Sequence, residues 1–432
     1  MVTRTPPLRA FGAIALALVL SLVGAGCGRN SAGPAEDGRT TLRFAWWGNE
    51  KRAEATQQAL RAFEAAHPGI TVIGESTEFS AYFDKLATGV AAGDAPDVFT
   101  LGGAYPAEYA GRGALLDLAS VSGSLDLDAL DASARQNGQV RGAQYGVSTG
   151  ANALAIVANP KVFAAAGVEL PDDDTWTWDD YAALATAITE KSPKGTYGTA
   201  TPLTHDSLDA YARQRGESLY TEDGKLGLTE QTVAAFFDYS LRLMKQQAAP
   251  PATITVEEEG ASTEQTLMGR GQAGMMLAWS NSVSALGTAT GTELKLLKLP
   301  GETPTPGIWL QSSQYYAISA KTEQADAAAK LINFLVNDER AASVLLTDRG
   351  VPANPEIRTA IADQLSPAGK VEVDYIDAIG KIEFAPTFIG PVGSTKVADI
   401  TSRVSTDVLF ERITPAEAAK QWLTESQQAI AG

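Results

Sequence analysis

Cysteine and histidine are nearly absent from this chain of 432 residues, which holds one cysteine, Cys27, and two histidines, His67 and His205. A single cysteine cannot form an internal disulfide. The sequence also lacks zinc-ligand spacing, the GxSxG motif of serine hydrolases and the Walker A motif. We therefore expect no bound metal, no cofactor and no catalytic residues, and a binding protein rather than an enzyme.

Basic residues are scarce as well. The 34 lysines and arginines are outnumbered by 51 aspartates and glutamates, so the net formal charge is −17. No stripe of basic residues is visible along the chain. We therefore expect no nucleic-acid partner and no polyanionic ligand, because both need a concentrated positive surface.

The chain also lacks an apolar run of about 20 residues, the length that a membrane-spanning helix needs. The apolar run 10–23 is shorter, follows Arg4 and Arg9, and leads through small residues to Cys27. This order is typical of a secretory signal peptide over residues 1–26. We expect Cys27 to be lipidated, which would anchor the exported chain to the outer face of the cytoplasmic membrane. The alternative is ordinary cleavage beside an incidental cysteine.

Residues 27–40 are rich in glycine, serine, proline and alanine and are expected to form a flexible tether. The body that follows has about 390 residues, which is large for one core, so two domains are expected. Strand-like and helix-like segments alternate along it, which predicts βαβ units with a parallel sheet and an α/β fold. The first such segments are 41–47, 50–66, 70–73, 82–92 and 97–101, and the alternation resumes after residue 150.

Three local motifs refine this picture. Residues 269–274 match GxGxxG, but a helix-like segment precedes them and an apolar strand-like run follows. A dinucleotide site needs the reverse order, so we do not expect one. Thr177 with Asp180, and Thr414 with Glu417, have capping-box spacing, so a helix is expected to begin after each threonine.

Aromatic residues recur where strands are expected to end. Trp46 and Trp47 close the first strand, and Trp279 follows another apolar run. Ligands of open parallel sheets bind beyond the carboxyl ends of the strands. Because neighbouring residues on a strand point to opposite faces, one of the two adjacent tryptophans is expected to pack and the other to reach the cleft. The alternative is that both are structural.

Planar polar side chains accompany some of these aromatics, as Gln311 does between Trp309 and Tyr315, and Tyr105 follows the third strand. A sugar presents apolar C–H faces ringed by hydroxyl groups, which flat aromatic surfaces with polar edges can bind. The aromatics at strand ends therefore favour a sugar site.

Four stretches of the chain resemble the extracellular solute-binding proteins of family 1, the carbohydrate-binding group of ABC importers. They lie at residues 53–70, 85–118, 159–180 and 271–279, and the second contains the Ala-Pro-Asp motif ending at Asp97. The resemblance runs from about residue 41 to residue 430. It implies a periplasmic-binding-protein fold, with two α/β lobes joined by a hinge and a ligand cleft between them. The implied lobes are discontinuous: 41–150 plus 300–352, and 151–299 plus 353–432.

The resemblance also implies roles for single residues. Asp97 matches a motif that often lines the cleft, and Asn152 stands where the maltose-binding branch has an acidic sugar ligand. The late-helix tryptophan of that branch has no counterpart here, with Phe384 or Phe388 as substitutes. The candidate ligand-binding residues are Trp46, Trp47, Tyr82, Asp97, Tyr105, Asn152, Trp279, Asn281, Trp309 and Gln311.

The function implied is capture of a sugar or oligosaccharide by hinge closure. A monomeric binding protein would deliver its ligand to the transmembrane subunits of an ABC permease. The alternatives are a non-sugar ligand such as a glycerophosphodiester or a metal chelate, a lipid-anchored glycoside-acting enzyme, and a sugar co-receptor for a sensor. An iron site at Tyr315 and Tyr316 is not expected, because adjacent strand residues face opposite ways.

Overall fold

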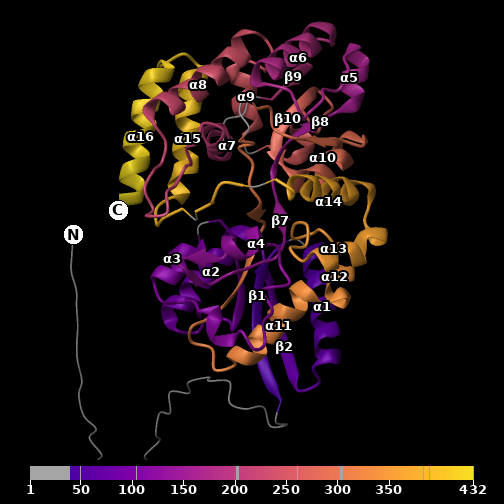
Figure 1. Cartoon of the computed structure of the whole chain (residues 1–432), viewed down its shortest axis with the longest axis vertical. Coiled ribbons are helices and arrows are strands. Elements are labelled where there is room, and N and C mark those ends of the chain that lie inside the picture. The colour runs from indigo at the N-terminus through magenta and orange to yellow at the C-terminus, as the bar shows by residue number, and fades with distance from the viewer. Residues whose placement is uncertain are drawn as a thin grey trace, which may run out of the picture.

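The computed structural model describes residues 39–48, 50–103, 105–200, 204–259, 261–301, 305–382, 384–388 and 390–431. The expected signal peptide, Cys27 and most of the expected tether lie outside the described residues. The described chain forms two α/β lobes, which we call the lower lobe and the upper lobe after their places in Figure 1. The family resemblance predicted this two-lobed α/β arrangement.

The lower lobe is built on a sheet with the strand order β2-β1-β3-β13-β6. Strand β1 pairs in parallel with β2 and β3, and β13 runs antiparallel to β3 and β6. The last strands and helices of this lobe return from far along the chain, as the orange α11 and α12 beside indigo β1 show in Figure 1. The elements of the lower lobe are β1 (Thr40–Trp47), α1 (Glu50–Ala66), β2 (Ile70–Thr77), α2 (Phe79–Ala92), β3 (Val98–Leu101), α3 (Tyr105–Gly111), η1 (Leu118–Val121), α4 (Ala132–Asn137), β4 (Gln139–Val140), β5 (Ala143–Gln144), β6 (Val147–Ser148), β13 (Tyr315–Ile318), α11 (Ala325–Asn337) and α12 (Glu339–Leu345).

Side-chain alternation along β1 gives this sheet a packed core on each face. Leu42, Phe44 and Trp46 enter the core that α1 and α11 cover. Ala45 and Trp47 enter the other core, which includes residues of α2. Burial of both faces explains why β1 is apolar along most of its length.

Strand β2 is longer than the sequence indicated, since it pairs with β1 from Ile70 to Thr77 rather than ending at Ile73. Gly74 interrupts the apolar pattern, but its place in the sheet has a steric reason. A Cβ atom at Gly74 would lie 2.9 Å from the Trp46 ring. The glycine therefore leaves room for Trp46, and the strand continues through it.

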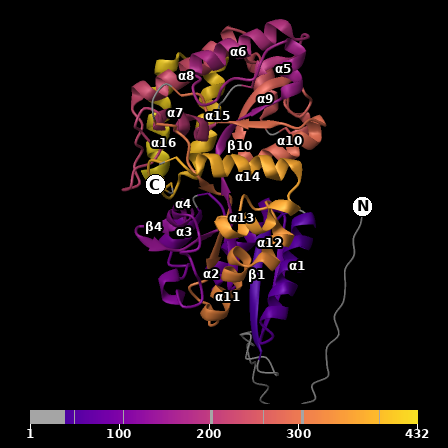
Figure 2. The ribbon, with the colours of Figure 1, turned by 45° about the vertical axis from the view of Figure 1, so that its right-hand side comes forward.

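The upper lobe is built on a shorter sheet with the strand order β11-β8-β10-β9. Strand β10 runs antiparallel to β8 and parallel to β9, and all five residues of β8 are buried. Helices surround this sheet, and the C-terminal helices α15 and α16, yellow in Figures 1 and 2, pack at one side of the lobe. The elements of the upper lobe are β8 (Leu154–Ala158), α5 (Pro160–Ala166), α6 (Trp178–Lys191), β9 (Tyr197–Thr199), α7 (His205–Arg213), α8 (Glu230–Lys245), α9 (Ala252–Glu258), η2 (Thr263–Gln265), β10 (Ala273–Trp279), η3 (Ser280–Ser282), α10 (Val283–Thr290), β11 (Lys295–Leu297), α13 (Pro355–Ile361), η4 (Ala362–Gln364), α14 (Pro367–Ile379), α15 (Thr395–Leu409) and α16 (Pro415–Ala431).

Both predicted capping boxes are confirmed. The Asp180 N–H donates to Thr177 Oγ1 at 3.1 Å, and the Thr177 N–H donates to Asp180 Oδ2 at 2.9 Å. Thr414 and Glu417 make the same reciprocal pair at the start of α16. In the glycine-rich segment, Gly271 has φ of 69° and β10 begins two residues later. A strand therefore follows the glycines, as the sequence indicated.

None of the helices in the described ranges combines the length and the apolar character needed to span a bilayer.

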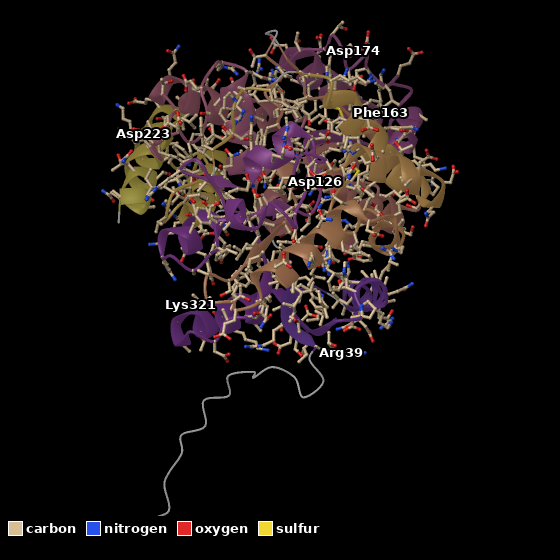
Figure 3. All side chains as sticks on the ribbon, turned by 60° about the horizontal axis from the view of Figure 1, so that its bottom comes forward. Arg39, Asp126, Phe163, Asp174, Asp223 and Lys321 are labelled. Atoms are coloured by element: carbon tan, nitrogen blue, oxygen red, sulfur yellow. The ribbon has the colours of Figure 1, made fainter. Side chains whose placement is uncertain are left out.

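Acidic side chains lie on the outer surface of both halves of the picture in Figure 3. Figure 3 shows Asp174 and Asp223 at the rim of the molecule, and both side chains are more than half exposed. These two carboxylates are therefore in contact with solvent.

Candidate functional site

The lobes are joined by chain segments that lie side by side in a hinge. In the described part of the chain, three crossings are seen: one through β7 (Ala151–Asn152), one through β12 (Gln311–Ser312) and one near Val351. The β7 and β12 strands are antiparallel, with Asn152 opposite Gln311. The Ala151 N–H donates to the Val351 carbonyl at 2.7 Å, and the Val351 N–H donates back to the Ala151 carbonyl at 3.0 Å. Figure 1 shows β7 between the two lobes.

The hinge is packed closely enough to require glycine. A Cβ atom at Gly150 would lie 2.6 Å from the Arg349 carbonyl oxygen and 2.7 Å from the Gly350 backbone. Gly350 itself has φ of 87°, a left-handed conformation that other residues rarely adopt. The crossings therefore touch backbone to backbone, so they form one narrow pivot.

A cavity of about 310 Å³ lies between the lobes, on the side of the hinge that α7 and α15 border. We call it the interlobe cavity. Gly103, Asn137 and Tyr315 come to it from the lower lobe, and most of its other residues come from the upper lobe. The complete lining is Gly103, Asn137, His205, Asp206, Asp209, Arg213, Ser218, Leu219, Tyr220, Trp309, Gln311, Tyr315, Thr387, Phe388, Gly390, Ser394, Thr395 and Ala398.

Trp279, Trp309 and Asp206 lie together beside this cavity, and we call these three residues the tryptophan corner. Trp279, at the end of β10, meets Trp309 edge to face, with ring centroids 5.6 Å apart and planes at 84°. The Trp279 Nε1–H donates to Asp206 Oδ2 at 3.1 Å. The other Asp206 oxygen lies 3.3 Å from His205 Nε2. The corner thus combines apolar ring surface with a carboxylate that can accept further hydrogen bonds.

A buried ion pair supports the wall behind the corner. Arg213 Nε donates to Asp209 Oδ2 at 3.2 Å, and Asp209 Oδ1 accepts the Leu219 N–H at 2.7 Å. Burial raises the pKa of Asp209, and the Arg213 charge acts against that increase. The guanidinium also lies 5.0 Å from the centre of the Trp309 ring. Arg213 therefore positions both Asp209 and Trp309.

Polar side chains connect the cavity to the hinge. The Trp309 Nε1–H donates to Gln311 Oε1 at 3.2 Å. Gln311 also lines the cavity and is the first residue of the hinge strand β12. Asn137 Nδ2 donates to the Leu310 carbonyl at 2.8 Å, and Thr387 Oγ1 donates to Asn137 Oδ1 at 3.4 Å. Asn137 belongs to the lower lobe and Thr387 to the upper lobe. A change in the angle between lobes would therefore alter the cavity wall directly.

Of the predicted residues, Trp309 and Gln311 line the interlobe cavity. Trp279 is outside the lining but contacts Trp309 and Asp206, which belong to it. Asn281 lies two residues beyond Trp279, is exposed, and does not line the interlobe cavity. Asn152 is buried in the hinge opposite Gln311 and is likewise outside the lining. Asn152 is thus placed to affect the pivot rather than to contact a solute in this structure.

The two adjacent tryptophans face opposite cores, as strand alternation predicted. Trp46 has no exposed surface and packs against Phe44, with ring centroids 5.0 Å apart. The expectation that Trp46 contacts a ligand must be corrected, because the α1 side of the sheet covers it completely. Trp47 is 8% exposed and packs among Phe79 and Phe83, near the carboxyl edge of the sheet. It supports an aromatic surface there, and it does not line the interlobe cavity.

Asp97 and Tyr82 also have structural surroundings. Asp97 precedes β3, at the amino end of a strand parallel to β1, so it lies at the edge of the sheet opposite to the cleft. Its carboxylate accepts the Arg43 N–H at 2.8 Å and the Thr322 hydroxyl at 2.5 Å. The Tyr82 hydroxyl donates to the Thr100 carbonyl at 2.8 Å in the interior. These contacts correct the expectation that Asp97 and Tyr82 line the cleft.

Tyr105 lies past the carboxyl end of β3, where the sequence placed it. It stacks on Phe83, with ring centroids 4.1 Å apart and planes at 11°, and remains partly exposed. Gly103 lines the interlobe cavity and Tyr105 does not. Tyr105 therefore stands at the margin of the site.

Sequence reasoning missed the main polar wall, which is helix α7. Asp206, Asp209 and Arg213 follow the 3–4 residue spacing that places side chains on one helix face. That spacing was visible, but nothing in the sequence shows that this face borders a cleft. Of the two proposed substitutes for the missing tryptophan, Phe388 lines the interlobe cavity and Phe384 does not.

Comparison with known proteins gives a family and a fold. The family model for bacterial extracellular solute-binding proteins matches residues 47–342 of this chain. The solved structure of a family 1 extracellular solute-binding protein from Alicyclobacillus acidocaldarius is similar to this one, with a TM-score of 0.75. Its sequence is 28% identical to this chain, and the match covers 91% of this chain and 99% of that chain. An uncharacterized lipoprotein in the oleD 5' region of Streptomyces antibioticus is 29% identical over 194 residues, which is 44% of this chain and 41% of that protein. The diacetylchitobiose binding protein DasA of Streptomyces coelicolor is 22% identical over 297 residues, 66% of this chain and 68% of that protein.

Proposed function

Because the chain belongs to the bacterial extracellular solute-binding proteins, we propose that it captures a sugar or oligosaccharide between its lobes and delivers it to an ABC permease. The family is one of binding proteins, and the fold is theirs. The observation that carries the proposal is the interlobe cavity with its Trp279, Trp309 and Asp206 corner. Perpendicular rings and a carboxylate suit a solute with apolar C–H faces and many hydroxyl groups.

The mechanism is hinge closure. Gly103, Asn137 and Tyr315 line the cavity from the lower lobe, and Asp206 and Trp309 line it from the upper lobe. A sugar that touches both sets stabilises the closed form by the difference between its affinities for the two forms. No bond is made or broken, so the sugar leaves the site unchanged. The relative that binds diacetylchitobiose supports a saccharide over other solutes.

The bodies that move are the two lobes, and the structure favours a boundary near Gln311 over one at residue 300. Ile308, Trp309 and Leu310 pack in the core of the upper lobe, so this segment moves with that lobe. The hydrogen bonds between Ala151 and Val351 support the remaining proposed boundaries, near residue 150 and residue 352.

Export, anchoring and a monomeric state complete the proposal. Residues 1–26 would be removed and Cys27 lipidated, so the tether would hold the protein at the outer face of the membrane beside its permease. A relative described as a lipoprotein supports the anchor. Radiolabelled palmitate incorporated by the wild type and not by Cys27→Ser would support lipidation. Equal incorporation by both would contradict it.

A thermal-shift screen of the purified protein against saccharides, glycerophosphodiesters and metal chelates tests the ligand class. A ligand at 100 times its dissociation constant adds about 2.7 kcal/mol of stability, which raises the melting temperature by several degrees. We expect saccharides to give the shifts. A shift with another class and none with saccharides would contradict the proposal. Chromatography of the recovered ligand checks that it is unchanged, since hydrolysis would indicate a glycoside-acting enzyme.

A further inference from the structure

The ionisable side chains around the interlobe cavity are unevenly shared between the two signs of charge. Its lining includes two carboxylates, Asp206 and Asp209, and one guanidinium, Arg213. His205 is the remaining nitrogen base in the lining that the structure describes. An anionic solute would need a cation here that is free to receive it, so the contacts of Arg213 decide what the site can accept.

Each nitrogen of the Arg213 guanidinium donates to the protein, which uses three of its five N–H donors. Its Nε donates to Asp209, its Nη1 to the Ala385 carbonyl at 3.2 Å and its Nη2 to the Pro386 carbonyl at 2.9 Å. The side chain is 3% exposed, and its Cζ lies over the Trp309 ring, 5.0 Å from the ring centre. A guanidinium binds a carboxylate best through two parallel N–H donors on one edge. Presenting such an edge would break contacts that fix residues 385 and 386.

Asp206 differs from Arg213 because its side chain is accessible to solvent. Its side chain is 22% exposed, whereas that of Asp209 is 12% exposed and paired with Arg213. Among the residues that the structure describes, Asp206 accepts a hydrogen bond from Trp279 and lies beside His205, and a carboxylate offers about four lone-pair positions. The negative charge on the accessible part of the wall is therefore the charge of Asp206.

The tryptophan corner adds to this preference. Trp279 is partly exposed and touches Asp206 through its ring nitrogen, so its ring lies beside the carboxylate. The face of an indole ring attracts cations, and the attraction grows where water is excluded. Because the Nε1–H lies in the ring plane, Asp206 is at the edge of the indole, and a positive group against Asp206 would meet the carboxylate with the partly exposed ring beside it.

From these contacts we propose that the site selects saccharides by charge, binding those with a protonated amine most tightly, neutral ones less tightly and those with a carboxylate least. The amine contacts Asp206 beside Trp279. This inference rests on the proposed saccharide-binding function and adds a rank order to it. Opposite charges attract at the wall, whereas a sugar carboxylate would be repelled by Asp206 and would find Arg213 buried and bonded to the protein.

Calorimetric titration of the purified protein with sets of oligosaccharides tests the rank order. Each set keeps one pyranose backbone and linkage. Chitosan, cellulose and chitin disaccharides supply an amine, a hydroxyl and an acetamide at C2, and the β-1,4-linked glucuronic acid disaccharide supplies a carboxylate at C6. An α-linked set of the same three charges covers the other linkage. We expect dissociation constants to rise by about tenfold from amine to neutral, and again from neutral to carboxylate.

The outcomes separate this inference from the function on which it rests. Tightest binding of a carboxylate sugar overturns the charge preference and leaves saccharide binding intact. Equal binding of amine and neutral members overturns the role of Asp206. If no saccharide of any charge binds, the proposed function fails and the charge preference fails with it.

Asp206→Asn isolates the charge, because an asparagine oxygen can still accept the Trp279 N–H. We expect it to bring the ratio of amine to neutral dissociation constants to about one. Asp363→Asn, an exposed position outside the cavity lining, removes the same charge and should preserve the ratio of the wild type. One molar salt shortens the screening length to about 3 Å and should reduce the amine preference of the wild type. An unchanged ratio in Asp206→Asn would contradict the proposal.

Discussion

Arg358 joins Asp131 to Asp377 across the hinge, and the three side chains line a second cavity with Trp309. Its Nη1 donates to Asp131 Oδ2 at 2.8 Å, and its Nε lies 3.0 Å from Asp377 Oδ1. Asp131 precedes α4 of the lower lobe, and Asp377 lies on α14 of the upper lobe. The same Nη1 also donates to the Pro352 carbonyl of the third crossing at 2.8 Å. One side chain therefore connects both lobes and the pivot between them.

We expect Arg358→Ala to lower the free energy of unfolding by about 1–2 kcal/mol and to widen the range of lobe angles. The carboxylates left behind are partly exposed, so water can solvate them and the loss is smaller than for a buried pair. Urea denaturation measures the stability, and small-angle X-ray scattering of the ligand-free protein measures the lobe spread.

Arg358→Lys is the matched control for this position. Lysine keeps the charge but cannot donate in the forked geometry of arginine, so we expect an intermediate loss. Arg358→Ala with unchanged stability and an unchanged scattering curve would show that the ion pairs do not hold the lobes together.

Gly150→Ala should disturb the pivot itself. The new Cβ would lie 2.6 Å from the Arg349 carbonyl oxygen and 2.7 Å from the Gly350 carbonyl group, and backbone atoms such as these have little room to relax. We expect a loss of about 1–3 kcal/mol in the free energy of unfolding, as for other overpacked interiors. Denaturation by urea measures it.

Gly111→Ala supplies the comparison for this substitution. It makes the same chemical change on α3, where a Cβ meets no atom within 4 Å. Because alanine favours a helix over glycine, this variant should be as stable as the wild type or slightly more stable. Equal effects of the two substitutions would argue against a tightly packed hinge.

The contrast between β1 and α7 shows what the sequence could predict. Alternation is a local property, so the opposite orientations of Trp46 and Trp47 followed from the strand alone. Capping at Thr177 was equally local. The role of Asp206 depends on which face of α7 the upper lobe turns toward the hinge, and only tertiary packing decides that.

Asp97 shows how a correct motif led to a wrong site residue. The Ala-Pro-Asp stretch was placed correctly beside a strand, but it comes before β3 and not after it. In a parallel sheet the two ends of a strand lie at opposite edges, so a shift of four residues moves a side chain from the cleft to the far edge. The hydrogen bonds of Asp97 to Arg43 and Thr322 then belong to the base of the lobe.

Glu372 should make the stability of the protein depend on pH. It lies on α14, is 2% exposed, and burial raises its pKa to about 7, with the Thr347 side chain acting against the increase. The unfolded chain has the ordinary, lower pKa, so the folded state holds the proton more tightly. This group therefore stabilises the fold at acidic pH, and the contribution is lost as the pH rises from about 4.5 to about 7.

Glu372→Gln keeps the shape of the protonated side chain and removes the titration. We expect the variant to match the wild type near pH 5 and to be more stable at pH 8, by about 3 kcal/mol at most. Urea denaturation at both pH values measures the difference between the two proteins, so other titrating groups cancel. A difference that does not change with pH would contradict the raised pKa.

Trp279→Leu and Trp46→Leu make the same chemical change in two tryptophans that the sequence could not tell apart. Trp46 has no exposed surface, so its replacement leaves a cavity beside Phe44 and should cost up to about 3 kcal/mol of stability. Trp279 is partly exposed beside Asp206 and the interlobe cavity, so its replacement should change stability little. It should instead weaken binding of the saccharide found by thermal shift by roughly tenfold or more, since aromatic residues dominate such contacts. Calorimetric titration and urea denaturation of both variants separate the two effects, and a stability loss without an affinity loss in Trp279→Leu would remove this tryptophan from the site.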